Sequence, residues 1–307
     1  MKEVGIFCRA VGPGPRGAKP LGDSTARRRV DPVVRPVLDA PALVVEPATR
    51  TARRTLVVAD LHLGLGASAD RPEGPPGGSA RSLAEELVRL LRDQDAETVL
   101  IAGDIKHPIV GTPPALRPIV FDFFATLLTE GFGAEVVLGN HDVGLVRHLP
   151  REVEVHPAAG LARDGVGVFH GHRWPSNAVL RSPVVVAGHL HPGFRLAPTR
   201  EHPAGKRPCW VRVEVAPRPP PKRRRRRRHA ELGAREVIVL PPFNPLAGIE
   251  SLNRGRPARG RSFLVGRFLS RGVARAYLLD GTDLGVLTKL GVHDPPKAAA
   301  GRSRSDR

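Results

Sequence analysis

The chain is poor in cysteine, which limits the chemistry it can use. Cys8 and Cys209 are the two cysteines among 307 residues. Two thiols make no disulfide framework and supply no thiolate set for a metal ion. We therefore expect a protein of the reducing cytoplasm, in which any metal site has nitrogen and oxygen ligands.

Long apolar runs are missing as well. No stretch approaches the roughly 20 apolar residues of a membrane-spanning helix. The N-terminus carries Glu3 and has only a brief apolar stretch before Arg9, which does not fit a signal segment. We expect a soluble protein with no membrane partner.

The remaining composition indicates one sizeable core. With 41% hydrophobic residues, a chain of this length can bury a large single core, and α/β domains of this size are often undivided. We expect one domain over residues 41–292. Residues 1–40 and 293–307, rich in basic residues and without periodicity, are expected to be a disordered extension and a disordered tail.

Five short apolar runs each lead into residues of metal-binding type. The runs are 56–59, 98–102, 135–138, 166–169 and 184–187. The residues that follow them are Asp60 and His62, Asp104, Asn140 with His141 and Asp142, His170, and His189 with His191. Seven of the twelve histidines lie in or beside these five places, so imidazole and carboxylate gather where strands would end.

The runs have the length and the aliphatic composition of buried strands in an α/β protein. In such sheets, side chains just beyond the carboxyl ends of the strands converge on one crevice. Asp60 and His62 lie two residues apart, as do His189 and His191, so strand alternation would point each pair to one side. The pattern predicts a metal site, and one with two metals.

These five blocks, in this order, resemble the signature of the calcineurin-like metallophosphoesterase superfamily. The blocks are Asp-Leu-His at 60–62, Gly-Asp-Ile-Lys-His at 103–107, Gly-Asn-His-Asp at 139–142, His-Gly-His at 170–172 and Gly-His-Leu-His at 188–191. Within the superfamily, the second block, the opening at 59–64 and the Leu-Pro-Pro-Phe-Asn-Pro stretch at 240–245 are similar to archaeal phosphoesterases related to the SbcD and Mre11 nucleases. A single block of this kind is weak, but five in order are specific.

The resemblance implies a fold and a role for each residue. The fold is an α/β sandwich of two mixed β-sheets flanked by helices. Asp60, His62 and His191 would hold a first metal, Asp104 would bridge both metals, and Asn140, His170 and His189 would hold the second. His141 would be the general acid, with Asp142 orienting its ring.

The residues themselves agree with a dinuclear centre. Oxygen and imidazole ligands suit manganese, which we favour, with iron and zinc as alternatives. A carboxylate shared by two ions sets them about 4 Å apart. A single histidine or aspartate at a strand end is more often a turn or capping residue, and the prediction depends on all five blocks occurring together.

Three further residues are candidates for substrate binding. His172 and Arg173 follow the fourth block and would contact a substrate phosphate; for Arg173 a solvated surface position is an equal alternative. His107 would face the substrate or support the site, although Pro108 after it enforces an extended turn, so a purely structural role is as well supported.

Charge is spread unevenly along the chain. The net charge is +6 over 1–54, −4 over 55–196 and +16 over 197–307, which gives the total of +18. Seven of the basic residues form one run, 222–228, within a Pro- and Arg-rich loop at 216–235. The run would bind phosphate backbones in a salt-dependent way, or it is an insertion without a selected role, and the two readings are equally supported.

The secondary-structure pattern is consistent with the sandwich. Ser82 and Glu85 form a capping-box pattern at the start of one helix, and a second helix is expected over about 115–130, with Gly131 as its stop. Strands are expected at 43–46, 210–215, 237–240, 263–266 and 276–279. A turn is expected at Asp280-Gly281.

We therefore expect a dinuclear-metal-dependent phosphoesterase. Basic flanks and the nuclease-related blocks favour phosphodiesters, including DNA or RNA. The related nucleases work with an ATPase subunit, but the sequence shows no docking element for one, so an ATPase or another repair protein is an unproven partner. A phosphatase or cyclic-nucleotide phosphodiesterase is the alternative for small substrates. A noncatalytic scaffold of the same fold is the rival class, but a scaffold has no chemical need for the complete ligand set and His141.

Overall fold

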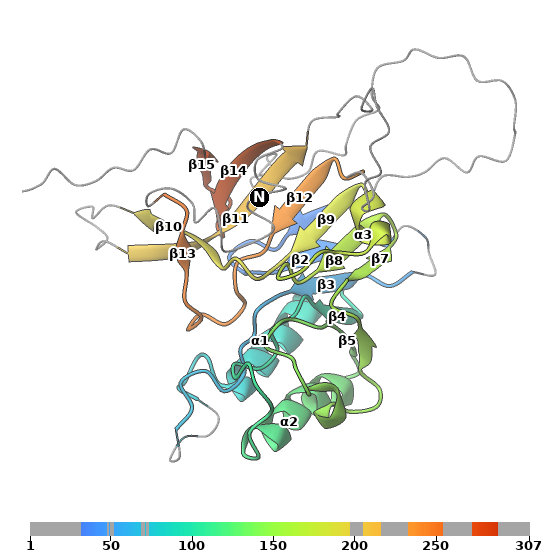
Figure 1. The fold of residues 1–307 in the computed structure, drawn as a ribbon, viewed down its shortest axis with the longest axis vertical. Coiled ribbons are helices and arrows are strands. Elements are labelled where there is room, and N and C mark those ends of the chain that lie inside the picture. The colour runs from blue at the N-terminus through green and yellow to red at the C-terminus, as the bar shows by residue number, and fades with distance from the viewer. Residues whose placement is uncertain are drawn as a thin grey trace, which may run out of the picture.

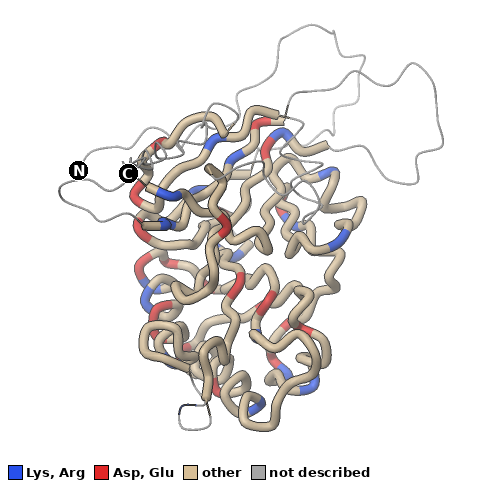
Figure 2. The backbone as a smooth tube through the Cα atoms, turned by 60° about the vertical axis from the view of Figure 1, so that its left-hand side comes forward, with Lys and Arg blue, Asp and Glu red and all other residues tan. Residues whose placement is uncertain are grey.

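The computed structural model describes residues 32–47, 49, 52–68, 71, 74–196, 205–215, 233–253 and 272–287. They form two β-sheets packed face to face, with helices on the outer faces (Figure 1). Acidic and basic residues are interspersed along this part of the chain (Figure 2). None of its helices is long and apolar enough to cross a membrane. The α/β sandwich predicted from the sequence is confirmed.

The first sheet has six strands in chain order. They are β1 (Val34–Pro36), β2 (Leu43–Val45), β3 (Thr55–Val58), β4 (Thr98–Ile101), β5 (Gly133–Val137) and β6 (Glu154–His156). The pairs from β3 to β6 are parallel, and β1 and β2 add antiparallel strands at one edge. β3 and β4 are buried along their whole length, which explains why they are continuous apolar runs.

The second sheet has nine strands. They are β7 (Leu161–Arg163), β8 (Val166–Phe169), β9 (Val184–Ala187), β10 (Pro192–Leu196), β11 (Gly205–Val215), β12 (Glu236–Val239), β13 (Glu250–Ser251), β14 (Gly272–Leu278) and β15 (Asp283–Val286). β8, β9 and β12 are parallel. β11 pairs antiparallel with β10 in its first half and with β12 and β14 in its second half. β14 and β15 form a hairpin, and the predicted turn at Asp280 and Gly281 lies between them.

Helices cover both outer faces. α1 (Ala80–Asp93) and α2 (Leu116–Thr129) bury their apolar faces against the first sheet. The short α3 (Asn177–Arg181) packs on the outer face of the second sheet. Between the sheets lies an aliphatic layer that includes Val57, Leu100, Val186 and Ile238. This layer brings the carboxyl ends of β3, β4, β5, β8 and β9 to one side of the molecule.

Several details differ from the sequence prediction. α1 begins earlier than the predicted capping box, because the Ser79 hydroxyl, rather than that of Ser82, caps the helix by accepting the Ser82 N–H. β1 lies within the stretch 1–40 that was expected to be disordered, and it pairs with β2. α2 ends as predicted, with Gly131 just beyond it in the left-handed conformation. The predicted strand at 263–266, residues 1–31, most of the loop at 216–235 and the tail at 293–307 lie outside the described residues.

Candidate metal centre

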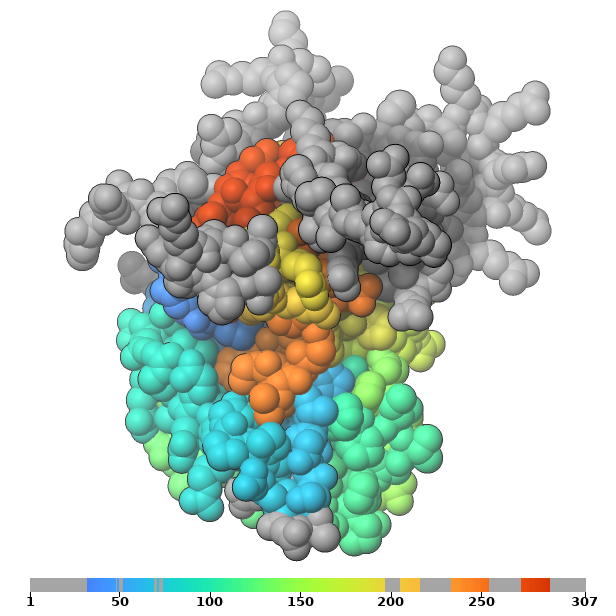
Figure 3. All heavy atoms as spheres, turned by 90° about the vertical axis from the view of Figure 1, so that its left-hand side faces the viewer, coloured from blue at the N-terminus to red at the C-terminus, as the bar shows by residue number. Residues whose placement is uncertain are grey.

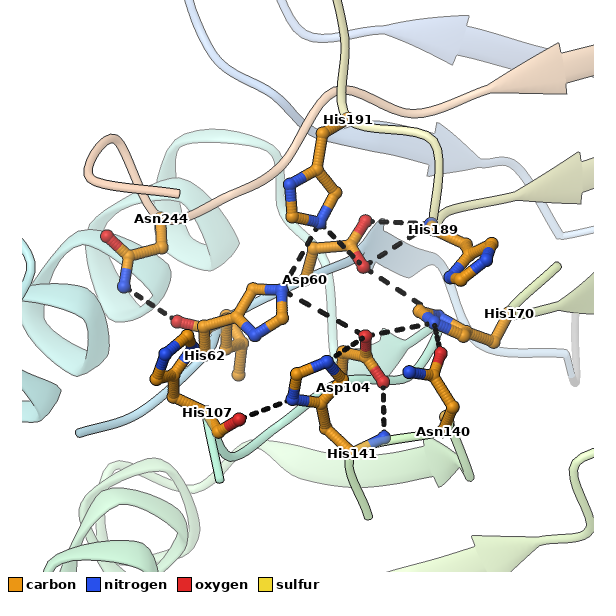
Figure 4. Close-up of polar contacts among 12 residues, drawn as sticks. Asp60, His62, Asp104, His107, Asn140, His141, His170, His189, His191 and Asn244 are labelled. Atoms are coloured by element: carbon orange, nitrogen blue, oxygen red, sulfur yellow. Dashed lines mark hydrogen bonds and ion pairs between the residues drawn. The ribbon is translucent and has the colours of Figure 1, made fainter. Parts of the chain in front are cut away.

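The predicted metal ligands meet at the carboxyl ends of the strands (Figure 4). Asp60 and His62 follow β3, Asp104 follows β4, and Asn140 follows β5 in the first sheet. His170 follows β8, while His189 and His191 follow β9 in the second sheet. The centre thus lies where both sheets end, and each sheet supplies part of it.

The ligand atoms fall into two groups. The first ligand group is Asp60, His62 and His191, and the second ligand group is Asp104, His170 and His189. Within each group the ligand atoms lie within 4.8 Å of one another. The two groups are those expected for the first and the second metal. In the second group, Asn140 joins through its Oδ1, which is 3.2 Å from His170 Nε2.

Asp104 connects the two groups. Its Oδ2 is 3.2 Å from His170 Nε2 in the second group and 4.0 Å from His62 Nε2 in the first. The same oxygen is 3.8 Å from His141 Nε2. Asp104 is therefore placed as a bridging carboxylate should be, with His141 at the edge of the same space.

The backbone at five of these ligands is strained. Asp60, His62, Asp104, His189 and His191 all have positive φ, a region that residues with a Cβ rarely adopt. Backbone hydrogen bonds hold three of them, from Asp60 N to Gly103 O, from His62 N to Asp104 O and from Glu250 N to His191 O. The side chains converge because of these left-handed turns. The strand alternation predicted from their two-residue spacing is not the cause, since these residues lie beyond the strands.

Carbonyl oxygens fix the orientation of two ligand rings. His170 Nδ1 lies 2.8 Å from Ala102 O, and His191 Nδ1 lies 2.7 Å from Gly248 O. A ring that donates its Nδ1–H to a carbonyl presents the Nε2 lone pair on its other side, as metal-bound histidines do. In both rings that side faces a carboxylate of the centre.

The donor set fits two divalent cations. His62 Nε2 and His191 Nε2 face each other at 3.2 Å, beside the Asp60 carboxylate, although each is a natural ligand atom. His62 Nδ1 is buried and has no partner within the described part of the chain. Burial lowers the pKa of both His62 and His189 to about 4, so these rings are neutral and ready to coordinate.

This chain is similar to a known protein family and to a solved structure. Residues 54–195, which contain all seven predicted ligands, match the family model described as the calcineurin-like phosphoesterase superfamily domain. This part of the chain is a calcineurin-like phosphoesterase domain. Among solved structures, the nuclease MPE of Pseudomonas putida is similar, with a TM-score of 0.47 and 22% sequence identity over 82% of this chain and 100% of that one. No curated protein matches the chain in sequence.

Charge in the second ligand group of the phosphoesterase domain favours cation binding. Burial opposes ionisation of Asp104, but the hydrogen bond from His170 and the charges around it outweigh this and hold its pKa below the usual range. Burial also opposes protonation of His170, yet Asp104 and Asp60 raise the pKa of this ring to about 9. The carboxylates that favour a proton on His170 Nε2 would also favour a metal cation there, so a proton and a metal ion would compete for this nitrogen.

Asp142 does not orient the His141 ring as expected from the sequence. Its carboxylate is buried and accepts backbone N–H groups from Gly139, Asp104 and Ile105 at 2.8–2.9 Å. It thereby ties the loop after β5 to the loop after β4. The ring of His141 is oriented instead by the carbonyl of His107, which is hydrogen-bonded to its Nδ1.

The three predicted substrate-binding residues lie at different distances from the centre. His107 is exposed beside it, with its ring centroid 5.9 Å from that of His141 and 5.5 Å from that of His62. The His172 ring is 5.4 Å from that of His170, at the edge of the second ligand group. Arg173 is exposed next to His172, where no contact ties it to the ligands among the described residues.

Two supporting residues were missed from the sequence. Asn244 is fully buried, and its side-chain amide donates to the carbonyl of Leu61, between the ligands Asp60 and His62. Lys106 is also fully buried, and its ammonium lies against the His141 carbonyl. Asn244 lies in the stretch 240–245, which the sequence connects with the site only through the family resemblance.

Figure 3 shows where this part of the chain lies. Atoms of the 233–253 segment (orange) lie between the cyan atoms of the N-terminal half and the yellow atoms of β11.

Proposed function

We propose that the protein is a phosphodiesterase that depends on two divalent metal ions, and that nucleic acid is among its substrates. The observation that carries this proposal is the position of Asp104, which lies within 4.0 Å of His62, His170 and His141 at once. One carboxylate between two groups of potential ligands, with an imidazole at its side, is an arrangement suited to ester hydrolysis assisted by two metals.

The chain supplies ligands for both ions. Asp60, His62 and His191 would hold the first, with Asp104 shared, and His170, His189 and Asn140 would complete the second. Two divalent cations held by these residues would stabilise charge on phosphoryl oxygens and would lower the pKa of an attacking water. The nitrogen and oxygen donors suit manganese, with iron or zinc as alternatives.

His141 is the general acid in this proposal. Its Nδ1–H donates to the His107 carbonyl, so Nε2 is turned toward the centre, 3.8 Å from Asp104. As the bond between phosphorus and the leaving oxygen breaks, the proton on Nε2 passes to that oxygen and the ring becomes neutral. A positioned acid of this kind contributes about 10²–10⁴-fold to the rate.

The charge of the site favours diesters over monoesters. Among the described residues, no lysine or arginine side chain donates a hydrogen bond to either ligand group, and the Lys106 ammonium is bound to carbonyl groups. A phosphate monoester carries nearly two negative charges at neutral pH, whereas a diester carries one. The described residues thus place no lysine or arginine at the ligands for the second negative charge of a monoester, and the single charge of a diester needs none.

The activity test compares substrates, metals and one variant. Purified protein with Mn²⁺, Fe²⁺ or Zn²⁺ is assayed with bis(p-nitrophenyl) phosphate as the diester and p-nitrophenyl phosphate as the monoester. We expect diester hydrolysis with Mn²⁺ that drops by about 10²-fold or more in His141→Ala. His148→Ala, which changes a partly exposed histidine of the neighbouring 3-10 helix η1 (Val146–His148), is the matched control and should remain active.

Other outcomes would select the alternatives. Hydrolysis of the monoester alone would make the protein a phosphatase. Metal binding without any hydrolysis would make it a scaffold.

The nucleic-acid part of the proposal has a separate test. The basic flanks of the chain, including Lys222 and the six arginines after it, would contact the phosphate backbone and release counterions. Affinity for single-stranded DNA should fall steeply with salt, and deletion of 222–228 should reduce the slope of log affinity against log salt. An unchanged slope would show that residues 222–228 do not contribute to DNA binding.

Protein partners such as an ATPase subunit are testable by copurification.

A further inference from the structure

Lys106 occupies a position that is unfavourable for a lysine unless its ammonium group is bound. The side chain has no exposed surface, and it lies between Ile105 and His107 in the loop after β4. Lysine is almost never fully buried, because removing an ammonium from water costs several kcal/mol without hydrogen-bond partners. The partners found here therefore identify what the lysine does.

The partners are backbone carbonyls from two loops. Nζ lies 2.5 Å from Pro108 O and 3.5 Å from Ile109 O in its own loop, and it also donates to the carbonyl of His141. An ammonium has three N–H donors, so these three acceptors account for all of them. Hydrogen bonds from a charged donor are shorter and about twice as strong as neutral ones. Lys106 thus fastens the loop of His107 to the loop of His141.

The same two loops hold the ring of His141. The carbonyl of His107 is hydrogen-bonded to His141 Nδ1, so the direction of Nε2 depends on how the two backbones lie relative to each other. Two contacts therefore join the same pair of loops. The Lys106 ammonium is bonded to the backbone carbonyl of His141, and the side chain of His141 is bonded to the backbone carbonyl of His107. A shift of one backbone would turn Nε2 away from Asp104.

We infer that Lys106 is a positioning residue for the general acid, which it sets in place through the backbone of His141. The inference rests on the proposed function of His141. Contact with substrate phosphate is not available to Lys106, because its side chain is buried and its donors are used. Its effect should appear in the proton-transfer step and should be absent from metal binding.

A leaving-group comparison isolates that step. Methyl phenyl phosphate needs a proton on its departing oxygen, whereas methyl 2,4-dinitrophenyl phosphate releases an anion that is stable without one. In Lys106→Met, which keeps the length of the side chain without its charge, we expect kcat for the phenyl diester to fall by about 10²-fold while the dinitrophenyl diester changes by less than about threefold. Manganese content and KM should be those of the wild type.

The controls separate the possible failures. His141→Ala should show the same dependence on the leaving group, and Lys206→Met, which removes an exposed ammonium bonded to the Ile249 carbonyl, should show none. A wild type that binds manganese but hydrolyses neither diester would overturn the proposed function. An active wild type, with equal losses on both diesters or no loss in Lys106→Met, would overturn the positioning role alone.

Folding of the variants is followed by thermal unfolding. Lys106→Gln, which keeps N–H donors without a charge, replaces Lys106→Met if the latter does not fold, and it should retain part of the rate for the phenyl diester. If neither variant folds, Lys106 is a residue of the core rather than a positioning residue.

Discussion

The two ligand groups differ in what holds them. The second group is built within a short part of the chain, where the Asp142 carboxylate ties Asp104 to the loop after β5 and the Ala102 carbonyl orients His170. The first group is supported by residues much farther along the chain. The Asn244 side chain donates to the Leu61 carbonyl, and the Gly248 carbonyl accepts a hydrogen bond from the His191 ring. Asn244 and Gly248 both lie beyond the matched phosphoesterase region, which ends at residue 195.

Exposure alone does not separate the two groups, because each has two buried ligands and one partly exposed ligand, His191 in the first group and His189 in the second. A ligand that is packed on all sides is fixed by its surroundings, while a more exposed one depends on a few directed contacts. The ring of His191 depends on the distant Gly248 carbonyl. The first group should therefore be the more easily loosened half of the centre, and the predictions below test this asymmetry.

The largest effect is expected where the groups meet. Asp104→Asn keeps the shape of the bridging side chain but removes its charge, so affinity for both metals should fall. The loss of diester hydrolysis should be about a thousandfold or more, since metal ions contribute several kcal/mol to such reactions. Metal content and kcat are the measurements. Asp164→Asn changes another aspartate with positive φ, in the turn between β7 and β8, and should behave as wild type.

The next effect begins in the second group, at the ligand that it shares with the first. In Gly139→Ala, the new Cβ would lie 2.2 Å from Asp104 Oδ1 and 2.3 Å from Asp104 N, so the loop after β5 must move. Overpacking of this kind costs about 1–3 kcal/mol of unfolding free energy. Urea unfolding should show that loss, together with weaker binding of the metals, and the weakening should be larger at the second site. Gly248→Ala, where nothing lies within 4 Å of the added Cβ, is the control, and equal losses in the two variants would contradict the structure.

A smaller and more selective effect is expected in the first group. Asn244→Ala removes the donor to the Leu61 carbonyl, and loss of such supporting contacts weakens metal binding by about 10–100-fold. Calorimetric titration with Mn²⁺ should show a higher dissociation constant at the weaker of the two sites and an unchanged dissociation constant at the other. Asn253→Ala, which alters a partly exposed asparagine bonded to the Arg195 backbone, is the matched control. Equal weakening of both sites in Asn244→Ala would abolish the distinction between the groups.

The sequence predicted which side chains meet at the centre better than it predicted the contacts that hold them there. Asp60, Asp104 and His189 could be found because parallel strands place their carboxyl ends together, so residue type and position after a strand were enough. The carbonyls of Ala102, His107 and Gly248 could not be found this way. Every residue has a carbonyl, and which one meets a ring depends on the backbone path.

The same limit applied to the buried polar residues. Asp142 was assigned to the ring of its neighbour His141, which is close in sequence, but the structure gives it the N–H groups of a loop almost 40 residues away. Lys106 and Asn244 have side chains that are usually solvated, and only the tertiary structure shows them buried. At α1, the capping-box spacing with Glu85 favours Ser82, whereas the helix is capped by Ser79, which has no Glu or Gln three residues after it.

The last prediction separates local support of the ligands from global stability. Glu135 on β5 binds His156 at 2.8 Å and Arg163 of the second sheet at 2.7 Å, away from both ligand groups. Burial opposes ionisation of Glu135, but these two partners outweigh it and hold its pKa below the usual value of 4.5. Because the pKa is lowered in the folded state, the stabilisation is present above about pH 4.5 and is lost as the pH falls through the lowered pKa.

Glu135→Gln should therefore lower the unfolding free energy by about 1–2 kcal/mol at pH 7, as expected for hydrogen bonds to a charged group. The difference from wild type should shrink as the pH falls below 4.5, where the unfolded wild type takes up a proton, and it should disappear below the lowered pKa, where the folded wild type is protonated too. Urea unfolding at pH 7 and at lower pH measures this, and Mn²⁺ titration should give unchanged affinities at both sites. If Glu135→Gln also weakened binding of the first metal, the first group would depend on the stability of the whole fold. The contacts of Asn244 and Gly248 would then not be the specific support of the first group.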